Sequence, residues 1–343
     1  MKALVLEKYG EFEYKDVEEP LYGDDDVLIK VKACAICGSD IHGMDGSTGR
    51  RIPPIIMGHE ASGVIEKAGR NVKGYKPGDR VTFDSTIYCG HCRFCRRGEI
   101  NLCDNRKVLG VSCTEYRLNG AFAEYVAVPW NILYPIPEKV SFLQAAMVEP
   151  LSVALHAVNR SPVLFNNTAV VVGAGMIGLL IIQLLKKAGC SRIIAVDRIR
   201  EKLDMAGRFG ADAGINAGEA DVASEVLKLT ENRGADIAFE AVGIAPTVKS
   251  AIASLRKGGS LTLVGNLMPL IDFPLQSVVT KQLSLFGTCA SAGEYPACLD
   301  LIASGKVDVD SFISAAAPLS EGAEWFKRLY NKEPGLMKVI LQP

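Results

Sequence analysis

The chain of 343 residues is longer than one ordinary hydrophobic core, so we expect two domains. Its 38 Lys and Arg residues balance 39 Asp and Glu residues, which excludes the basic surface that nucleic acids and anionic membranes require. Hydrophobic residues make up 48% of the sequence, enough for a large packed interior. The expected partners are therefore small molecules, with neither nucleic acid nor membrane among them.

One segment, residues 161–185, resembles a membrane span because it carries no charge. Asn166, Asn167 and several glycines interrupt it, and a strand followed by a helix accounts for it better. Charged residues at positions 2, 7 and 8 interrupt the N-terminus before the apolar part of a signal peptide could form. We therefore expect a cytoplasmic protein.

The two halves of the sequence differ in their hydrophobic periodicity. Up to about Phe142, short apolar runs bounded by Gly, Pro and Asp predict β-strands, and no helical periodicity is evident. Later, strand-like runs alternate with helical patterns, which predicts a doubly wound parallel sheet with helices on both faces. The predicted strands are 27–31, 64–66, 80–83, 123–128, 169–172, 192–196, 235–239, 260–264 and 283–286, and the predicted helices are 176–187, 200–209, 221–232 and 247–255.

The residues after about position 290 are more than one further strand needs, so we expect them to return to the first domain. The expected division is a β-rich domain of residues 1–151 with 290–343, and an α/β domain of residues 152–289.

A glycine motif marks the start of the α/β domain. Gly173, Gly175 and Gly178 form the pattern G-x-G-x-x-G, with Ile177 inside it, directly after a predicted strand and before an apolar helix. In that context the glycines allow a tight turn and close approach of a pyrophosphate to the helix N-terminus. Asp197 ends the second strand, where a carboxylate accepts hydrogen bonds from the adenosine ribose and repels a 2′-phosphate. This favours NAD over NADP, although Arg198 beside it could accommodate the phosphate.

Four cysteines lie close together in the first domain, at positions 89, 92, 95 and 103. Clustered cysteines in a reduced compartment indicate a metal before a disulfide. An iron–sulfur cluster is the alternative, but its fourth cysteine is expected after three residues and before a proline, whereas Cys103 follows after seven and precedes Asp104. The spacing favours a zinc ion with four protein ligands, which has no open position and is structural.

A second set of potential zinc ligands is dispersed in the sequence. Cys37, the pair His59-Glu60, and Glu149 could supply a thiolate, an imidazole and a carboxylate, and leave a coordination position for substrate. Their spacing is not local, so the residues alone support this site only weakly.

Several motifs together resemble the medium-chain zinc-dependent alcohol dehydrogenases, and within them the polyol branch that includes sorbitol and galactitol-1-phosphate dehydrogenases. They are the segments 37–42 (CGSDIH), 58–63 (GHEASG) and 149–153 (EPLSV), the four-cysteine segment and the glycine motif, in this order along nearly the whole chain. The resemblance implies a GroES-like catalytic domain, a Rossmann domain, two zinc ions per chain and NAD as cofactor.

The resemblance also implies residue roles. Cys37 and His59 would bind the catalytic zinc, and Glu60 and Glu149 would alternate or share a further position. Ser39 would contact the substrate hydroxyl, and His42 would relay its proton to solvent. The further cofactor contacts, some expected from the fold and some implied by the resemblance, would be at Lys202, Val242, Val264, Gly265 and Thr288.

The expected reaction is transfer of a hydride from a secondary alcohol, a polyol or polyol phosphate, to NAD, which gives a ketone. The alternatives are a threonine-type amino-alcohol dehydrogenase and a non-catalytic zinc protein. Sorbitol dehydrogenases have a tyrosine and a substrate-binding arginine where this chain has Gly43 and Ala290, so sorbitol itself is not implied. Arg50 or Arg51 would meet a substrate phosphate or lie exposed in a loop. Relatives form homotetramers or homodimers through the last strands of the nucleotide domain.

Overall fold

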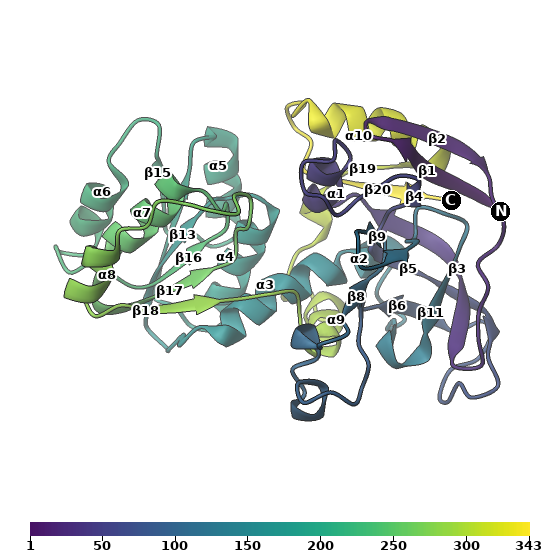
Figure 1. Cartoon of the computed structure of the whole chain (residues 1–343). Coiled ribbons are helices and arrows are strands. Elements are labelled where there is room, and N and C mark those ends of the chain that lie inside the picture. Colours follow the sequence, from purple (N-terminus) through teal and green to yellow (C-terminus); the bar gives the residue numbers. More distant parts are fainter. The chain divides into compact units, whose positions relative to one another are not determined.

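Residues 1–343 are described by a computed structural model, which divides into two compact units (Figure 1). The first contains residues 1–150 and 292–343, and the second contains residues 151–291. The helix α3 (Val148–Arg160) begins at the end of one unit and continues into the other. No helix combines the length and the apolar character that crossing a membrane would require.

The first unit is built mainly from antiparallel strands, because its short β-branched runs are separated by turn residues. Its largest sheet has the order β12-β6-β5-β3-β20-β19, and β11 pairs with β3. Its strands are β1 (Lys2–Lys8), β2 (Glu11–Asp16), β3 (Asp26–Ala35), β4 (Ile55–Ile56), β5 (Glu60–Ala68), β6 (Arg80–Phe83), β7 (Thr86–Ile87), β8 (Lys107–Val108), β9 (Val111–Ser112), β10 (Arg117–Leu118), β11 (Tyr125–Pro129), β12 (Leu133–Pro135), β19 (Ile313–Pro318) and β20 (Lys338–Gln342).

The C-terminal segment completes this sheet. Strand β20 pairs antiparallel with β3, with Leu341 opposite Cys34, and Figure 1 shows this yellow strand among the purple and blue strands of the N-terminal part. The core between the strands contains fully buried side chains such as Leu6, Ile29 and Phe122. The helices of this unit are α1 (Gly38–Gly43), α2 (Phe142–Ala146), α9 (Tyr295–Ala303) and α10 (Gly322–Tyr330).

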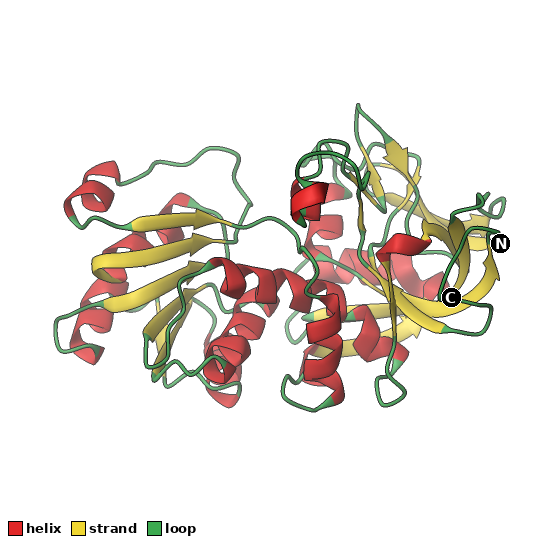
Figure 2. Ribbon diagram, turned by 90° about the horizontal axis from the view of Figure 1, so that it is seen from below, coloured by secondary structure: helices red, strands yellow, loops and turns green.

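The second unit is a six-stranded parallel sheet in the order β15-β14-β13-β16-β17-β18, with helices packed beside it (Figure 2). The chain turns direction in the sheet at β13, as expected of a doubly wound fold, which confirms the predicted fold class. Its strands are β13 (Thr168–Val172), β14 (Arg192–Asp197), β15 (Ala213–Asn216), β16 (Ala235–Glu240), β17 (Leu255–Leu263) and β18 (Ser284–Gly287), and its helices are α4 (Met176–Lys187), α5 (Arg200–Arg208), α6 (Val222–Leu229), α7 (Ala245–Ser254) and α8 (Leu275–Thr280).

Two helices differ from what the sequence pattern indicated. No strong helical periodicity appears before about Phe142, yet a helix, α1, forms at residues 38–43. With six residues it is too short to show a hydrophobic period, and it carries polar side chains instead. The predicted helix 221–232 was too long, because α6 ends at Leu229 and Glu231 and Asn232 adopt left-handed backbone angles.

Candidate functional site

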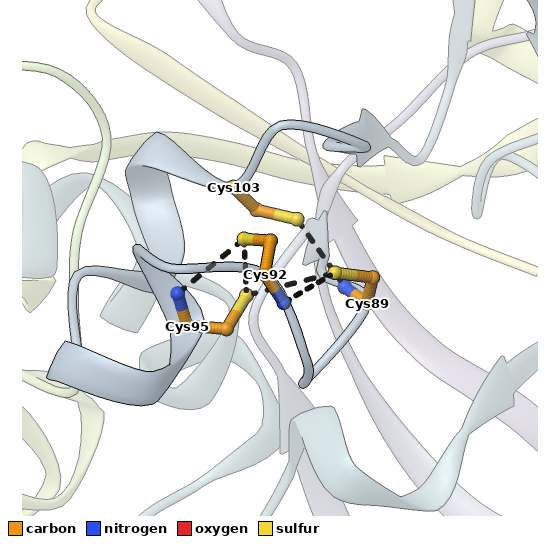
Figure 3. Close-up of side chains that lie close together, drawn as sticks. All are labelled: Cys89, Cys92, Cys95 and Cys103. Atoms are coloured by element: carbon orange, nitrogen blue, oxygen red, sulfur yellow. Dashed lines mark hydrogen bonds between the residues drawn. The ribbon is translucent and has the colours of Figure 1, made fainter.

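The four cysteines of the first unit converge in space (Figure 3). Their sulfur atoms all lie within 4.8 Å of one another, with 3.5 Å between the sulfurs of Cys92 and Cys95 and 4.0 Å between those of Cys89 and Cys95. Sulfur atoms that bind one tetrahedral zinc ion at about 2.3 Å are about 3.8 Å apart, so this arrangement fits the ion. All four positions would be filled by protein, which is the pattern of a structural metal.

Backbone N–H groups point at these sulfur atoms. Cys89 N donates to Cys103 Sγ at 3.3 Å, and Cys92 N donates to Cys89 Sγ at 3.4 Å. Hydrogen bonds from the backbone, led by that of His91, lower the pKa of Cys89 to about 6. Burial, followed by the neighbouring thiol of Cys92, raises the pKa of Cys95 to about 12. The cluster therefore favours a thiolate at Cys89 and a protonated thiol at Cys95. Binding of a metal ion would release the protons that remain on the thiols.

A second group of ligand atoms lies where α1 and β5 begin. Cys37 is the residue before α1, and His59 and Glu60 stand at the start of β5. Their ligand atoms lie within 4.8 Å of one another, although Cys37 and Glu60 are far apart in sequence. His59 and Glu60 are buried, whereas Cys37 is partly exposed. This donor set fits zinc.

The carboxylate of Asp40 lies next to the imidazole ring of His59. Its Oδ1 lies 3.5 Å from His59 Nδ1, and the carboxylate is completely buried. Burial raises the pKa of Asp40, but His59 and Arg51 outweigh it and hold the pKa well below its usual range. Burial also lowers the pKa of His59, but the charges of Asp40 and Cys37 outweigh it, so the net pKa is raised. The negative charge of Asp40 beside this imidazole favours a cation in this group of residues.

Arg51 occupies a position that the sequence analysis did not foresee. It is neither a free cation for a phosphate nor an exposed loop charge, because its side chain is 4% exposed and its Nη2 lies 2.9 Å from Asp40 Oδ1. The neighbouring Arg50 is exposed, as the loop interpretation expected. The sequence gives no signal for this difference, because both arginines stand in the same polar loop.

Glu60 is held by a lysine from the other end of the chain. Lys338 Nζ donates to Glu60 Oε2 at 2.6 Å and to the carbonyl oxygen of Ile36 at 3.0 Å, and both charged side chains are buried. The second oxygen of Glu60, Oε1, is buried without a hydrogen-bond partner. A buried carboxylate oxygen that nothing satisfies is costly, so it is suited to a metal ion. Sequence reasoning missed Lys338 because nothing local marks it.

Glu149 lies close enough to influence this group electrostatically, but it is not among the three residues whose ligand atoms converge. Burial, followed by the negative charge of Glu60, raises the pKa of Glu149 to about 8. Two carboxylates beside one another favour a shared proton or a cation between them. The structure therefore brings Cys37, His59 and Glu60 together and leaves Glu149 beside them.

Ser39 and His42 stand on the same short helix, α1. Ser39 Oγ lies 3.5 Å from His59 Nε2, and His42 lies in the last turn, exposed to solvent. Ser47 Oγ donates to the carbonyl oxygen of His42 at 2.6 Å, which fixes the end of the helix. A hydroxyl beside the ligand group and an imidazole at the surface are thus only three residues apart.

The glycine motif in the second unit leaves room for a ligand. Gly173 has φ 97° and Gly178 packs against its carbonyl oxygen, so a side chain at either position would be blocked. A Cβ at Gly175 would meet no atom within 4 Å, which leaves open space at the N-terminus of α4. Gly173 and Gly178 are thus tightly packed, whereas Gly175 between them is open. This arrangement would let a pyrophosphate approach the backbone.

Asp197, the last residue of β14, is hydrogen-bonded to the glycine turn. Its Oδ2 accepts a hydrogen bond from Ala174 N at 2.8 Å, and its Oδ1 accepts from Arg198 N at 2.8 Å and from Ile199 N at 3.0 Å. The carboxylate is thereby fixed beside the glycine turn, where an adenosine ribose would lie in a Rossmann fold. Arg198 is exposed and Lys202 is half-buried on the following helix α5.

The other expected cofactor residues follow the carboxyl ends of neighbouring strands. Val242 comes after β16 and Val264 after β17, and the backbone of Gly265 packs against that of Gly243, where neither glycine has room for a side chain. Thr288 follows β18, and its Oγ1 is buried without a hydrogen-bond partner. All of these residues follow the carboxyl ends of the strands, which is where ligands of such folds bind.

Comparisons with known proteins identify the family of this chain. Residues 23–138 match the family model of the alcohol dehydrogenase GroES-like domain, and residues 177–304 match that of zinc-binding dehydrogenases. The sorbitol dehydrogenase of Bacillus subtilis (strain 168) is 33% identical, and the alignment covers 100% of this chain and 97% of that protein. This chain belongs to the zinc-dependent alcohol dehydrogenase family. It is a dehydrogenase whose family uses zinc and a nicotinamide dinucleotide.

Solved structures of this family have the same fold. The galactitol-1-phosphate dehydrogenase of Escherichia coli aligns with a TM-score of 0.92 and 28% identity, covering 100% of both chains. A structure from Sinorhizobium meliloti 1021, described as a zinc-binding dehydrogenase bound to NADP, aligns with a TM-score of 0.90 and 32% identity, covering 100% of this chain and 99% of the other. The predicted family and polyol-like resemblance are confirmed.

Proposed function

We propose that this dehydrogenase oxidises a secondary alcohol of a polyol or polyol phosphate to a ketone and transfers the hydride to NAD. The convergence of Cys37, His59 and Glu60, separate from the four-cysteine cluster, is the observation that carries this proposal. A chain with only a structural zinc would not need a second buried donor set. Residues 1–151 with 290–343 serve as the catalytic zinc domain, and residues 152–289 as the NAD-binding domain.

Cys37, His59 and Glu60 hold the catalytic zinc in this proposal, and the unpartnered Oε1 of Glu60 supports direct binding by that residue. Glu149 lies beside them with its raised pKa and would be the carboxylate that alternates with Glu60 or shares its position. When bound, the zinc ion acts as a Lewis acid that lowers the pKa of the substrate hydroxyl. Cys89, Cys92, Cys95 and Cys103 hold the structural zinc.

Ser39 accepts the proton of the substrate hydroxyl and His42 delivers it to solvent, because one lies beside His59 and the other at the surface. The reaction then balances as alcohol plus NAD⁺ giving ketone, NADH and one proton. The open turn at Gly175 takes the pyrophosphate, and Asp197 accepts the hydrogen bonds of the adenosine ribose. The carboxylate of Asp197 favours NAD over NADP, as a 2′-phosphate would meet its negative charge.

We further propose a homodimer or homotetramer that forms through the edge strand β18 in the cytoplasm. Exposed apolar side chains lie on this strand and in the segment between β17 and β18, and a second copy of the chain would cover them. They are Leu267, Met268, Leu270, Phe273, Leu275, Val279 and Leu285. None of the ten cysteines is in a disulfide, and reduced cysteines suit the cytoplasm.

A panel of substrates tests the proposed reaction. Purified protein loaded with zinc is given polyols, polyol phosphates, simple secondary alcohols and threonine, each with NAD⁺ or NADP⁺, and NADH or NADPH formation is followed by absorbance. We expect the highest kcat/KM for a polyol or its phosphate with NAD⁺. A higher kcat/KM for threonine would replace the polyol assignment, and turnover with none of these alcohols would overturn it.

A further inference from the structure

Arg51 is a buried cation that the proposed reaction does not yet use. Its Nε and Nη2 donate to Asp40 Oδ1 at 3.2 Å and 2.9 Å, and its Nη1 donates to the carbonyl oxygen of Arg50 at 2.9 Å. Removing a guanidinium and a carboxylate from water is expensive, and such buried pairs are often no more stabilising than apolar residues of similar size. A role in holding neighbouring groups explains the pair better than stability does.

The same guanidinium belongs to a closed ring of contacts around the candidate zinc ligand. Arg51 Nη2 lies 3.4 Å from Ser39 Oγ, and Ser39 Oγ lies 3.5 Å from His59 Nε2. On the other side, His59 Nδ1 lies 3.5 Å from Asp40 Oδ1, which Arg51 holds. Arg51 therefore contacts two groups beside the His59 ring, the Asp40 carboxylate near Nδ1 and the Ser39 hydroxyl near Nε2.

Gly43 provides the space that this arginine occupies. A Cβ at Gly43 would lie 2.5 Å from Arg51 Cγ and 3.4 Å from Arg51 Cβ. Gly43 is the last residue of the helix α1 and has no left-handed backbone angle, so its conformation does not require glycine. The backbone beside Arg51 is also fixed, because Ser112 N donates to the carbonyl oxygen of Arg50 and Ile52 N donates to that of Ser112.

We propose that Arg51 is a positioning residue, which acts through Asp40 and Ser39 to hold the His59 ring and the Ser39 hydroxyl in their working orientation, and that Gly43 is required to admit it. The inference rests on the proposed function for the part that concerns Ser39. Partners that orient a metal-binding histidine typically change metal affinity or activity about 10- to 100-fold when they are removed. Arg51 does not touch His59 itself and acts on it through the carboxylate of Asp40.

Arg51→Gln and Arg51→Lys test the proposal in the full-length protein. For Arg51→Gln we expect kcat to fall about 10- to 100-fold with little change in KM, and the affinity of the Cys37 site for zinc, measured by chelator competition, to fall as well. Arg51→Lys keeps the charge and should recover part of both losses. The matched control is Arg70→Gln, which removes an exposed arginine paired with Asp24 at 2.8 Å and should change neither value. A kcat and a zinc affinity within about two-fold of the unmodified protein in Arg51→Gln would overturn the proposal.

Gly43→Ala provides a second test that leaves Arg51 in the chain. Alone, it should lower kcat and zinc affinity, because the new methyl group displaces the arginine. Combined with Arg51→Ala, which removes the clashing Cγ, it should cause no further loss, so that the two effects are not additive. Full additivity would show that Gly43 and Arg51 act separately. If the Arg51 variants do not fold, as judged by circular dichroism, Gly43→Ala alone decides. Because zinc affinity is measured without substrate, it judges Arg51 even if no alcohol is oxidised.

Discussion

At the scale of single residues, the cysteines of the two candidate metal sites have different neighbours. Cys37 stands beside a buried imidazole and a buried carboxylate, whereas Cys103 lies among three other cysteines and accepts hydrogen bonds from backbone N–H groups. A site with mixed ligands can leave a position open for substrate, and a site of four thiolates cannot. One substitution at each site should therefore have different consequences.

Cys37→Ala is expected to abolish turnover, to leave NAD binding near normal, and to reduce the zinc content from two ions per chain to one. Cys103→Ser should also remove one zinc ion, but it should lower the thermal unfolding temperature, because the loop of residues 89–103 loses its cross-link. Zinc content by atomic emission, NADH absorbance and circular dichroism measure these effects. A single zinc per chain that is lost in Cys103→Ser and kept in Cys37→Ala would contradict the catalytic site.

At the scale of elements, Asp236 connects three strands of the parallel sheet. From β16 it accepts hydrogen bonds from Thr168 N on β13 at 2.8 Å and from Arg256 Nε on β17 at 2.6 Å. Arg233 Nη2 is a further donor, at 3.0 Å. Burial raises the pKa of Asp236, but these donors outweigh it and lower the pKa. The ionised form is therefore the one that stabilises the sheet.

Because its pKa is lower in the folded state, Asp236 contributes stability that is fully present above the unfolded value of about 3.9 and is lost as the pH falls through the folded value. Asp236→Asn should lower the free energy of unfolding at pH 7 by about 2 kcal/mol. The difference between the two proteins should shrink below about pH 4. Urea unfolding at several pH values measures this, and a difference that stays constant down to pH 3 would contradict the assigned contacts.

The elements themselves were largely predictable from hydrophobic periodicity. The five strands and four helices expected in residues 169–286 correspond to β13, β14, β16, β17, β18 and α4 to α7. The strand β15, with one large apolar residue in its sequence AGIN, and the short α8 gave no clear signal. The helix α1, with six residues, was not predicted because it is too short to show a helical period. The candidate site was predictable only in part, since the contacts of Lys338 with Glu60 and of Arg51 with Asp40 depend on tertiary structure.

At the scale of the whole molecule, the apolar side chains beside β18 predict self-association. Leu285 on this edge strand is 38% exposed and Val279 on α8 is 67% exposed. Burying such residues against a second copy would also pair the free backbone groups of the edge. An edge of this kind is expected to be covered in the working protein.

The double variant Leu285→Lys and Val279→Lys should shift the protein from a dimer or tetramer toward the 36.8 kDa monomer. Light scattering coupled to gel filtration measures the mass. Leu21→Lys, which changes a leucine that is 97% exposed in the other unit, is the control and should leave the mass unchanged. A monomeric unmodified protein would refute the proposed assembly.

The pairing of β20 with β3 has a consequence for biosynthesis. The nucleotide-binding unit is continuous from residue 151 to residue 291 and can fold as soon as it leaves the ribosome. The unit that holds Cys37 is interrupted by the other one, and a nascent chain lacks Lys338, and hence the cation beside Glu60, until residue 338 has been translated. We therefore expect a metal ion to be held at Cys37, His59 and Glu60 only after residues 151–291 have been synthesised.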